Sequence, residues 1–397
     1  MKILYLAHRI PYPPNKGDKI RSFHEIRYFG RRHEVHLLAF CDQPGDGAYA
    51  TKLSEYCRRV TLVPLSHWPQ RFRAATAMLL GKPWTLGYFA NPAMRNALDR
   101  ELLEDSFDLV FAYSSSMAPY IAPLGGLPRI LDFVDSDASK WRQYARMGSV
   151  PSKWLYDFEW RKLNKYEAET ISHLDSSIFV SPREARHLAK IVDAGKLCFI
   201  QNGVDLGYFS AVPRAGSSRS IIFTGAMDYF PNIEAVNFFA REVLPIVHAA
   251  IPDTQFLIVG SNPSRQVRML ADLPGVIVTG TVKDVRPYLS EAGVSVVPVK
   301  VSQGIQNKIL EALASGLPVV ATRAALGGMA STRDLPVAEA DDAPAFAEHV
   351  IKFLKNPLTN GQIETCRRML KLNYDWDTNL SAFERLFERL VPSHSTV

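Results

Sequence analysis

Short apolar runs recur along the first half of the chain, and segments with helical spacing separate them. We predict strands, in chain order, at Lys2–Ala7, Val35–Phe40, Val60–Pro64, Leu109–Tyr113, Ile130–Phe133, Ser177–Val180 and Leu197–Ile200. A helix is expected from about Asp18 to Phe29. Alternation of strands and helices predicts a parallel sheet with helices on both faces.

The second half repeats this pattern. A turn at Asn202-Gly203 and a polar stretch of small residues, Pro213–Ser220, separate the two halves. Further strands are predicted at Ile221–Phe223, Phe256–Val259, Val276–Val278, Val294–Val297 and Val319–Ala321, with a helix from about Pro231 to Phe239. Two such series predict two Rossmann-like domains.

The most informative stretch runs from Gly304 to Thr322. Its apolar residues Ile305, Ile309, Ala312 and Leu313 have the spacing of one helix face. Gly316 is a typical helix stop, and Leu317–Ala321 has the composition of a buried parallel strand.

Lys308 and Glu311 project from one side of this helix, about 5–6 Å apart at Cβ. A cation in the first turn opposes the helix dipole but suits a bound phosphate, which helix N-termini attract. Glu311, one turn deeper, could accept two hydroxyl protons, as on a ribose. A surface ion pair between the two side chains explains the spacing equally well.

Composition and charge indicate the class of protein and its compartment. The 397 residues are 47% hydrophobic and 22% charged, which is ordinary for two globular domains. The four cysteines have no C-x-x-C spacing, so buried thiols are expected and a zinc site is not. Because no apolar run could span a bilayer and Ile3–Ala7 is too short for a signal peptide, we expect a cytoplasmic protein. The net charge of +6 fits anionic substrates or an anionic membrane face.

The stretch from Gly304 resembles the donor-binding motif of family 4 retaining glycosyltransferases. Glu311, Ala312, Ala314, Gly316 and Pro318–Ala321 match that motif in register, whereas Gln303 stands where the family has its first glutamate. The segment G-I-Q-N-K-I-L-E-A is similar to the motif of one branch of this family. That branch is found among sugar transferases of exopolysaccharide loci associated with PEP-CTERM and exosortase systems.

The resemblance implies an α/β protein of GT-B fold with two Rossmann-like parallel-sheet domains. Residues 1–205 would form the acceptor domain and 206–375 the nucleotide-sugar donor domain. The helical stretch from Trp376, about 376–397, would cross back onto the first domain.

The resemblance also implies an activity. The chain would be a retaining, metal-independent hexosyltransferase that moves a sugar from a nucleotide-sugar donor to a growing, lipid-linked glycan in exopolysaccharide biosynthesis. No cofactor and no nucleic-acid partner are expected, and the enzyme could contact an anionic membrane at its inner, cytoplasmic face.

The donor site implied by the resemblance follows the strands of the second domain. Lys308 and Glu311 are the expected catalytic residues, with Lys308 stabilising the leaving diphosphate. The full donor-binding set is Gly225, Asn232, Lys300, Gly304, Ile305, Gln306, Asn307, Lys308 and Glu311. The Arg and Lys that usually follow the family's F-T-G loop are missing after Gly225, and no metal ligand set is visible to replace them.

The acceptor or cleft side is predicted in the first domain. The residues expected there are Gly17, Arg21, Ser114, Asp135 and Asp137. For Asp135 or Asp137 taken singly, a helix N-cap is the plainer interpretation. For Ser114, contact with the sugar and capping of a helix both stay open.

Two segments mix basic and aromatic residues. These are Trp68–Lys82 and Lys140–Lys165. Such helices can lie on an anionic bilayer, or can simply bury their aromatic side chains against a sheet.

Two other functions stay open, and a third lacks the motif it requires. A nucleotide-sugar epimerase would share the fold, and a non-catalytic sugar- or nucleotide-binding protein would be consistent with Gln303. A dinucleotide-dependent oxidoreductase needs G-x-G-x-x-G after a strand, and neither the His8–Asp18 loop nor the Thr224–Asn232 loop supplies it.

Overall fold

The computed structural model describes residues 1–147, 151–181, 185–186, 188–210, 212, 218–302, 304–329 and 331–391. Gln303 and most of the predicted linker, residues 213–217, lie outside this part. The chain divides into two compact units, Met1–Ile200 with Leu380–Val397, and Gln201–Asn379. The sequence had suggested boundaries at 205/206 and 375/376. Each unit is described by itself.

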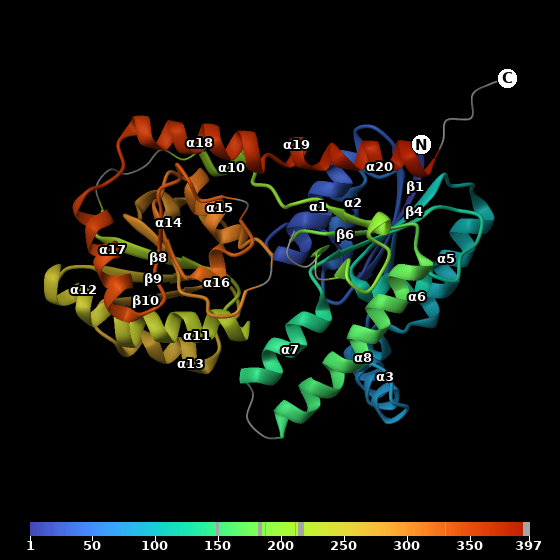
Figure 1. The fold of residues 1–397 in the computed structure, drawn as a ribbon, viewed down its shortest axis with the longest axis horizontal. Coiled ribbons are helices and arrows are strands. Elements are labelled where there is room, and N and C mark those ends of the chain that lie inside the picture. The colour runs from blue at the N-terminus through green and yellow to red at the C-terminus, as the bar shows by residue number, and fades with distance from the viewer. Residues whose placement is uncertain are drawn as a thin grey trace. The chain divides into compact units, whose positions relative to one another are not determined.

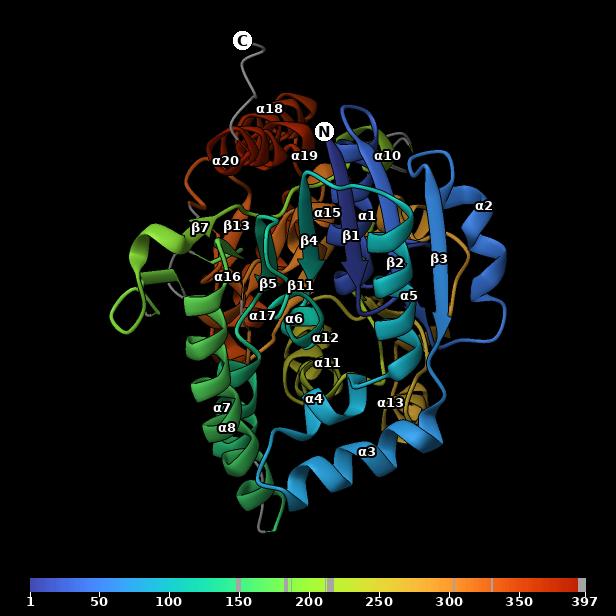
Figure 2. The ribbon, with the colours of Figure 1, turned by 90° about the vertical axis from the view of Figure 1, so that its right-hand side faces the viewer.

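The first unit is built on a seven-stranded parallel sheet, in the order β3-β2-β1-β4-β5-β6-β7 (Figures 1 and 2). The strands are β1 (Lys2–Ala7), β2 (Glu34–Cys41), β3 (Arg59–Pro64), β4 (Leu109–Tyr113), β5 (Arg129–Val134), β6 (Ser176–Phe179) and β7 (Leu197–Phe199). Every strand predicted in this half is confirmed, with ends displaced by at most one residue.

Helices cover both faces of this sheet. They are α1 (Gly17–Gly30), α2 (Ala50–Leu53), α3 (His67–Leu79), α4 (Trp84–Phe89), α5 (Pro92–Glu104), α6 (Ala118–Ile121), α7 (Asp137–Met147), α8 (Ser152–His173) and α20 (Ala382–Leu390), with 3-10 turns η1 (Asp46–Tyr49), η2 (Ser115–Met117) and η3 (Ala194–Lys196). Phe383 of α20 lies 5.2 Å from Phe29 and 5.5 Å from Phe111, measured between ring centroids. The C-terminal helix is therefore part of the first unit's core.

The second unit has a six-stranded parallel sheet, in the order β10-β9-β8-β11-β12-β13. Its strands are β8 (Ser220–Thr224), β9 (Gln255–Val259), β10 (Val276–Gly280), β11 (Val294–Val297), β12 (Val319–Ala321) and β13 (Val337–Glu339). The strand β13 was not predicted, because it is three residues long and none of the three is fully buried.

The helices of the second unit again lie on both sides of the sheet, with α11 to α13 on one side and α14 and α15 on the other (Figure 1). They are α10 (Leu206–Ser210), α11 (Phe230–Phe238), α12 (Leu244–Ala250), α13 (Arg265–Arg268), α14 (Arg286–Glu291), α15 (Asn307–Ala314), α16 (Arg323–Leu326), α17 (Ala343–Lys355), α18 (Asn360–Tyr374) and α19 (Trp376–Leu380), with the π-helix η4 (Phe239–Val243) and the 3-10 turn η5 (Met269–Asp272). In the described part of the chain, no helix combines the length and apolar character that crossing a bilayer requires.

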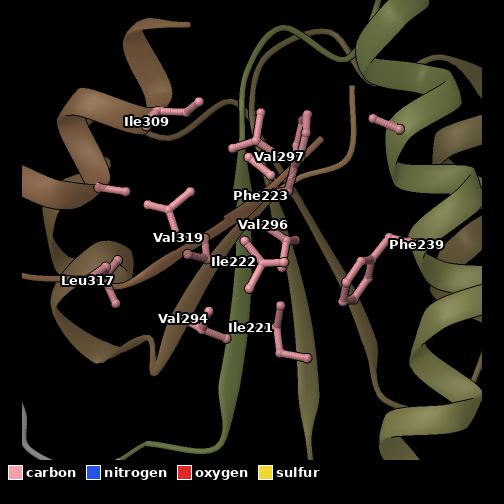
Figure 3. Packing of buried hydrophobic residues seen from close by; sticks show 14 of the residues in the cluster. Ile221, Ile222, Phe223, Phe239, Val294, Val296, Val297, Ile309, Leu317 and Val319 are labelled. Atoms are coloured by element: carbon pink, nitrogen blue, oxygen red, sulfur yellow. The ribbon is translucent and has the colours of Figure 1, made fainter. Parts of the chain in front are cut away.

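The core of the second unit is built around the central strands β8 and β11 (Figure 3). Ile221, Ile222 and Phe223 of β8 are fully buried, so this strand is covered on both faces, as the apolar runs predicted. Ile309 of α15 closes the core from one side and Phe239 from the other. The elements that carry the candidate site therefore rest on a rigid base.

Each sheet reverses its strand order at one place. In the first unit this switch lies between β1 and β4, and in the second between β8 and β11. Ligands of open α/β sheets bind at the carboxyl ends of the strands beside such a switch. The loops after β1, β4, β8 and β11 are therefore where binding residues are expected.

Candidate functional site

Gly225 directly follows β8 at the switch point of the second unit. A side chain at this position would put its Cβ 2.8 Å from Asn232 Nδ2, closer than real Cβ contacts come, and 3.0 Å from Lys308 Nζ, which is tighter than most Cβ contacts. Gly225 also has a φ of +155°, which side-chain-bearing residues rarely adopt. Glycine is therefore required here, and it brings backbone close to two polar side chains.

Lys308 is the second residue of α15, one position further into the helix than Asn307. Its Nζ donates to Asn232 Oδ1 at 2.8 Å and lies 4.1 Å from the centre of the Phe223 ring. Asn232, in the first turn of α11, is held in turn by a bond from its Nδ2 to the carbonyl of Ala226 at 2.9 Å. The ammonium group thus links the helix after β11 to the helix after β8, across the switch point.

Lys308 and Glu311 are both half-buried, and neither forms an ion pair with another described residue. No oxygen of Glu311 lies within the 4.0 Å of an ion pair with Lys308, although both residues are described. Burial lowers the pKa of Lys308 to about 7, and the charge of Glu311 offsets only part of that effect. Burial likewise raises the pKa of Glu311 to about 7. The surface ion pair considered from the sequence is therefore wrong.

The N-terminus of α15 has no side-chain cap and no acidic residue in its first turn. Gln306, at the N-cap position, uses its side-chain amide to donate to Ser302 Oγ at 2.9 Å instead. Its neighbour Asn307 accepts a bond from Asn202 Nδ2 at 3.1 Å. An uncapped N-terminus beside an ammonium group favours an anion.

Three further predicted donor residues lie in the loop before α15. Gly304 is buried with a φ of +61°, and a Cβ at Gly328 would come within 1.9 Å of the Gly304 carbonyl oxygen, so this loop is closely packed. Ile305 is buried in the core. Lys300 is exposed, and its Nζ lies 4.5 Å from the centre of the Phe238 ring.

Polar atoms also gather at the switch point of the first unit. His8 follows β1, Tyr113 ends β4, and their rings stack at 5.8 Å and 14°. Within the described ranges, His8 Nδ1, the Tyr113 hydroxyl and Asp135 Oδ1 are buried without a hydrogen-bond partner. Burial raises the pKa of Asp135 to about 7. Buried unpaired polar atoms are costly, so a cluster of them is typical of a ligand site.

Asp137 differs from Asp135 because its oxygens are already paired. Ser115 Oγ donates to Oδ2 at 2.6 Å, and Lys140 Nζ lies 2.5 Å from Oδ1. Burial opposes ionisation, yet Lys140 and Ser115 together lower the pKa of Asp137. The capping role considered for the aspartates belongs to Ser136, whose Oγ accepts from the Ser139 amide at 3.1 Å.

Ser114 accepts a bond from the Ser116 amide at 3.5 Å and is the N-cap of the 3-10 turn η2, with a φ of +82°. Gly17 begins α1 and is exposed, and a Cβ there would meet nothing within 4 Å. Neither residue is held by its surroundings in a way that demands a binding role.

Arg21 was expected on the acceptor or cleft side, and this expectation is wrong. It lies inside the first unit with no exposed surface, and its guanidinium meets Asp132 Oδ2 at 2.6 Å, Glu25 Oε1 at 3.0 Å and the Ile200 carbonyl at 2.9 Å. Its donors face α1 and β5, so Arg21 holds the helix to the sheet and is not a cleft residue.

One cluster could resemble a metal site. In the described ranges, Glu34, His36 and Asp105 form the single group of this kind, with ligand atoms within 4.8 Å of one another. Lys2 Nζ lies 3.3 Å from Glu34 and 2.7 Å from Asp105, so a cation is already supplied. The group lies at the amino ends of β1 and β2, away from the candidate site.

The sequence named Lys308 and Asn232 without connecting them. Their contact joins residues 76 positions apart, and no local pattern indicates it. The unpaired Tyr113 hydroxyl was not singled out either, although its place at the end of a predicted strand was the signal that could have found it.

Family models match a segment in each half of the chain. The family described as Glycosyltransferase Family 4 matches residues 23–208, and the family described as Glycosyl transferases group 1 matches residues 218–356. Phosphatidyl-myo-inositol mannosyltransferases of Mycobacterium leprae and Propionibacterium freudenreichii are 27% and 26% identical, over 50% and 54% of this chain. These matches span 55% and 56% of the relatives' own length.

Solved structures extend the likeness in fold to nearly the whole chain. A sucrose-phosphate synthase from Thermosynechococcus elongatus superposes with a TM-score of 0.71 at 17% identity, covering 98% of this chain and 99% of that one. The Anabaena protein HepE, solved with UDP and glucose, gives 0.67 at 13% identity, covering 98% and 100%. These findings confirm the predicted α/β fold and support a glycosyltransferase of the family 4 type, with two Rossmann-like parallel-sheet domains and GT-B structural neighbours.

Proposed function

We propose that the chain is a retaining hexosyltransferase that moves a sugar from a nucleotide-sugar donor to a growing, lipid-linked glycan, as in exopolysaccharide biosynthesis. It would work without a metal ion or cofactor, at the cytoplasmic face of a membrane. The observation that carries the proposal is the half-buried Lys308 ammonium, whose hydrogen-bond partner among the described residues is a neutral amide and which lies beside the uncapped start of α15.

The chemistry needs a group of this kind. As the bond between the sugar's anomeric carbon and the diphosphate oxygen breaks, negative charge accumulates on the phosphate. Lys308 Nζ and the α15 N-terminus would stabilise that charge, while Gly225 allows close approach of the phosphate to backbone. An ammonium has three donor hydrogens, and the bond to Asn232 uses one of them.

In a retaining reaction of this type, the acceptor hydroxyl attacks from the face that the diphosphate leaves. The acceptor oxygen forms the new bond to the anomeric carbon, and its proton passes to the departing phosphate oxygen. The enzyme's own groups then serve to stabilise charge and to orient the two substrates. Glu311, one turn after Lys308 on α15, is the proposed partner of the ribose hydroxyls.

The acceptor would be held by the first unit. His8, Tyr113 and Asp135 offer buried polar atoms without partners, which hydroxyl groups of a sugar or of a lipid-linked glycan could satisfy. Gly17, Ser114 and Asp137 line the ends of the neighbouring elements and would complete this side.

The donor and the stereochemistry can be tested together. A thermal-shift panel of UDP, GDP, ADP and TDP sugars should identify one base that raises the melting temperature. Turnover of that donor, followed by proton NMR, should give a product with the donor's anomeric configuration. An inverted product would contradict the retaining mechanism, and sugar isomers formed without an acceptor would show an epimerase instead.

Metal independence needs its own test. Turnover should persist in EDTA, because cationic side chains and a helix N-terminus are proposed to neutralise the diphosphate. Loss of turnover in EDTA that added Mg²⁺ or Mn²⁺ restores would contradict the mechanism built on Lys308.

A further inference from the structure

Helix α3 carries its large apolar side chains on the side that faces solvent. Trp68, Phe72 and Leu79 are spaced four and seven residues apart, which places them on one helix face, and they are 81%, 76% and 83% exposed. Leu80, just after the helix, is 69% exposed. The buried residues of α3 are instead Gln70 and Ala77. An ordinary surface helix has the opposite arrangement.

This orientation is fixed by contacts on the inner face. Arg73 Nη1 donates to the carbonyl of Ala90 at 3.0 Å, just beyond the end of α4. A Cβ at Gly87 would come within 2.5 Å of the Ala77 Cβ, so α3 and α4 are in close contact. The contacts of Arg73 and Ala77 hold the other face of α3 against α4, so the apolar face points outward.

The same lobe of the first unit is basic. The segment from Ser66 to Asn91, which includes α3 and α4, contains Arg71, Arg73 and Lys82 and no Asp or Glu. The Arg71 guanidinium lies 5.9 Å from the Trp68 ring centre, so charge and apolar surface are adjacent. Exposed apolar side chains on a segment that carries only basic charges are complementary to a negatively charged, partly apolar surface.

The lobe extends to the start of α8. Glu159 of α8 accepts bonds from the Trp84 and Thr85 amides, both at 2.9 Å, and so ties α8 to α4. Lys153 and Trp154 at the beginning of α8 are exposed. Figures 1 and 2 both show α3 and the α7–α8 pair at the same end of the first unit.

We propose that this lobe, α3 with the beginning of α8, docks on the surface of an anionic lipid bilayer. Trp68, Phe72, Leu79 and Leu80 would enter the boundary between headgroups and acyl chains, with Arg71 and Lys153 at the level of the lipid phosphates. The binding is interfacial. It deepens the membrane location proposed above by naming the surface responsible, and it is argued from the lobe's surface and not from the transferase activity.

Vesicle co-sedimentation tests the docking without any sugar donor. The full chain should bind vesicles of phosphatidylcholine with 30% phosphatidylglycerol at least tenfold more tightly than vesicles of phosphatidylcholine alone. Each basic side chain near an anionic surface contributes about 1 kcal/mol, roughly fivefold in binding, so Arg71→Glu should weaken binding by at least that factor. The double variant Trp68→Ser/Phe72→Ser should weaken binding about tenfold or more, since both side chains would enter the bilayer.

Leu103→Ser is the matched control. Leu103 of α5 is 87% exposed but lies among Glu101, Glu104 and Asp105, so its loss should leave vesicle binding within twofold of wild type. All the altered side chains are exposed, and an unchanged melting temperature checks that each variant folds.

Two results would overturn the proposal. One is vesicle binding that is unaffected by the α3 variants or is equal on neutral and anionic lipid. The other is sedimentation equilibrium showing that the wild-type chain self-associates through this face, and that Trp68→Ser/Phe72→Ser abolishes self-association without changing vesicle binding. Because no sugar transfer is measured, loss of the transferase proposal would leave this test unaffected.

Discussion

Arg21 in the first unit is a buried cation and Lys308 in the second is a half-buried one, and their surroundings differ. Arg21 meets two carboxylates and a carbonyl, and although burial opposes its charge, Asp132 and Glu25 raise the pKa of Arg21. Lys308 donates to one neutral amide, and burial lowers the pKa of Lys308 to about 7. A buried cation that the fold neutralises holds the fold together. One that the fold leaves without an anion is available for a ligand.

The largest effect should come from breaking the neutralised cation. Arg21→Met leaves Asp132 and Glu25 buried without their partner, and loss of one member of a buried pair costs about 3–5 kcal/mol. The free energy of unfolding, measured with urea, should fall by that amount.

The control for Arg21 is Arg219→Met. Arg219 pairs with Asp253 at 3.0 Å in an exposed position, where such pairs contribute about 0–1 kcal/mol. Equal losses of stability in Arg21→Met and Arg219→Met would show that Arg21 is not a structural cation.

Lys308→Met should have the reverse profile, with an intact fold and a loss of turnover. Groups aimed at charge that develops in the transition state are worth about 2.7–4 kcal/mol, or roughly 10²–10³ in turnover. Substrate affinity should fall less than turnover, because the contact strengthens as the diphosphate leaves. Steady-state kinetics provide the measurement.

Lys352→Met is the matched control for that loss. Lys352 is exposed near the end of α17, where its charge faces solvent, so turnover should not change. Turnover of Lys308→Met within threefold of wild type would rule Lys308 out as the phosphate ligand.

A smaller effect is expected at Glu311. Hydrogen bonds to a charged acceptor contribute about 1.5–3 kcal/mol, so Glu311→Gln should weaken nucleotide binding roughly 10- to 100-fold. Because Glu311 has no ion-pair partner among the described residues, its neutralisation should not destabilise the fold. Calorimetry that finds unchanged nucleotide affinity would refute the ribose assignment.

The local elements of the donor side followed from the sequence. The apolar run of β8, the helical spacing before Gly316 and the stop at that glycine, which has a φ of +83°, are encoded by neighbouring residues. What the sequence could not give was long-range pairing. The bond from Lys308 to Asn232 depends on how β8 and β11 are ordered in the sheet, which neither segment specifies alone.

Two expectations from the first half of the chain show a second limit of sequence-based prediction, which concerns the side chains that become buried. Arg21 lies after a glycine loop, which is a common place for ligand contacts. Its side chain nevertheless points into the sheet and binds Asp132, which is 111 positions further along the chain. The mixed pattern of Trp68–Lys82 left open which face of the helix is buried. Only the contacts of Gln70, Arg73 and Ala77 decide that the aromatic face is outside. Burial of polar residues is set by distant partners.

The smallest predicted effect is the pH dependence of nucleotide affinity, and it tests the role of Lys308 most directly. If Lys308 binds the diphosphate, the bound anion must raise the pKa of Lys308 from about 7. Nucleotide affinity should then be greatest below that pKa and fall as pH rises through it, by up to about tenfold per pH unit.

The decisive measurement is calorimetric titration at pH 8.5 in buffers of different ionisation enthalpy. The probe is whichever of UDP, GDP, ADP and TDP raises the melting temperature most. At this pH the phosphates are already ionised, so we predict uptake of close to one proton by the wild type and none by Lys308→Met. No uptake by the wild type, or the same uptake in the variant, would contradict the claim that Lys308 is held without an anion in order to bind one.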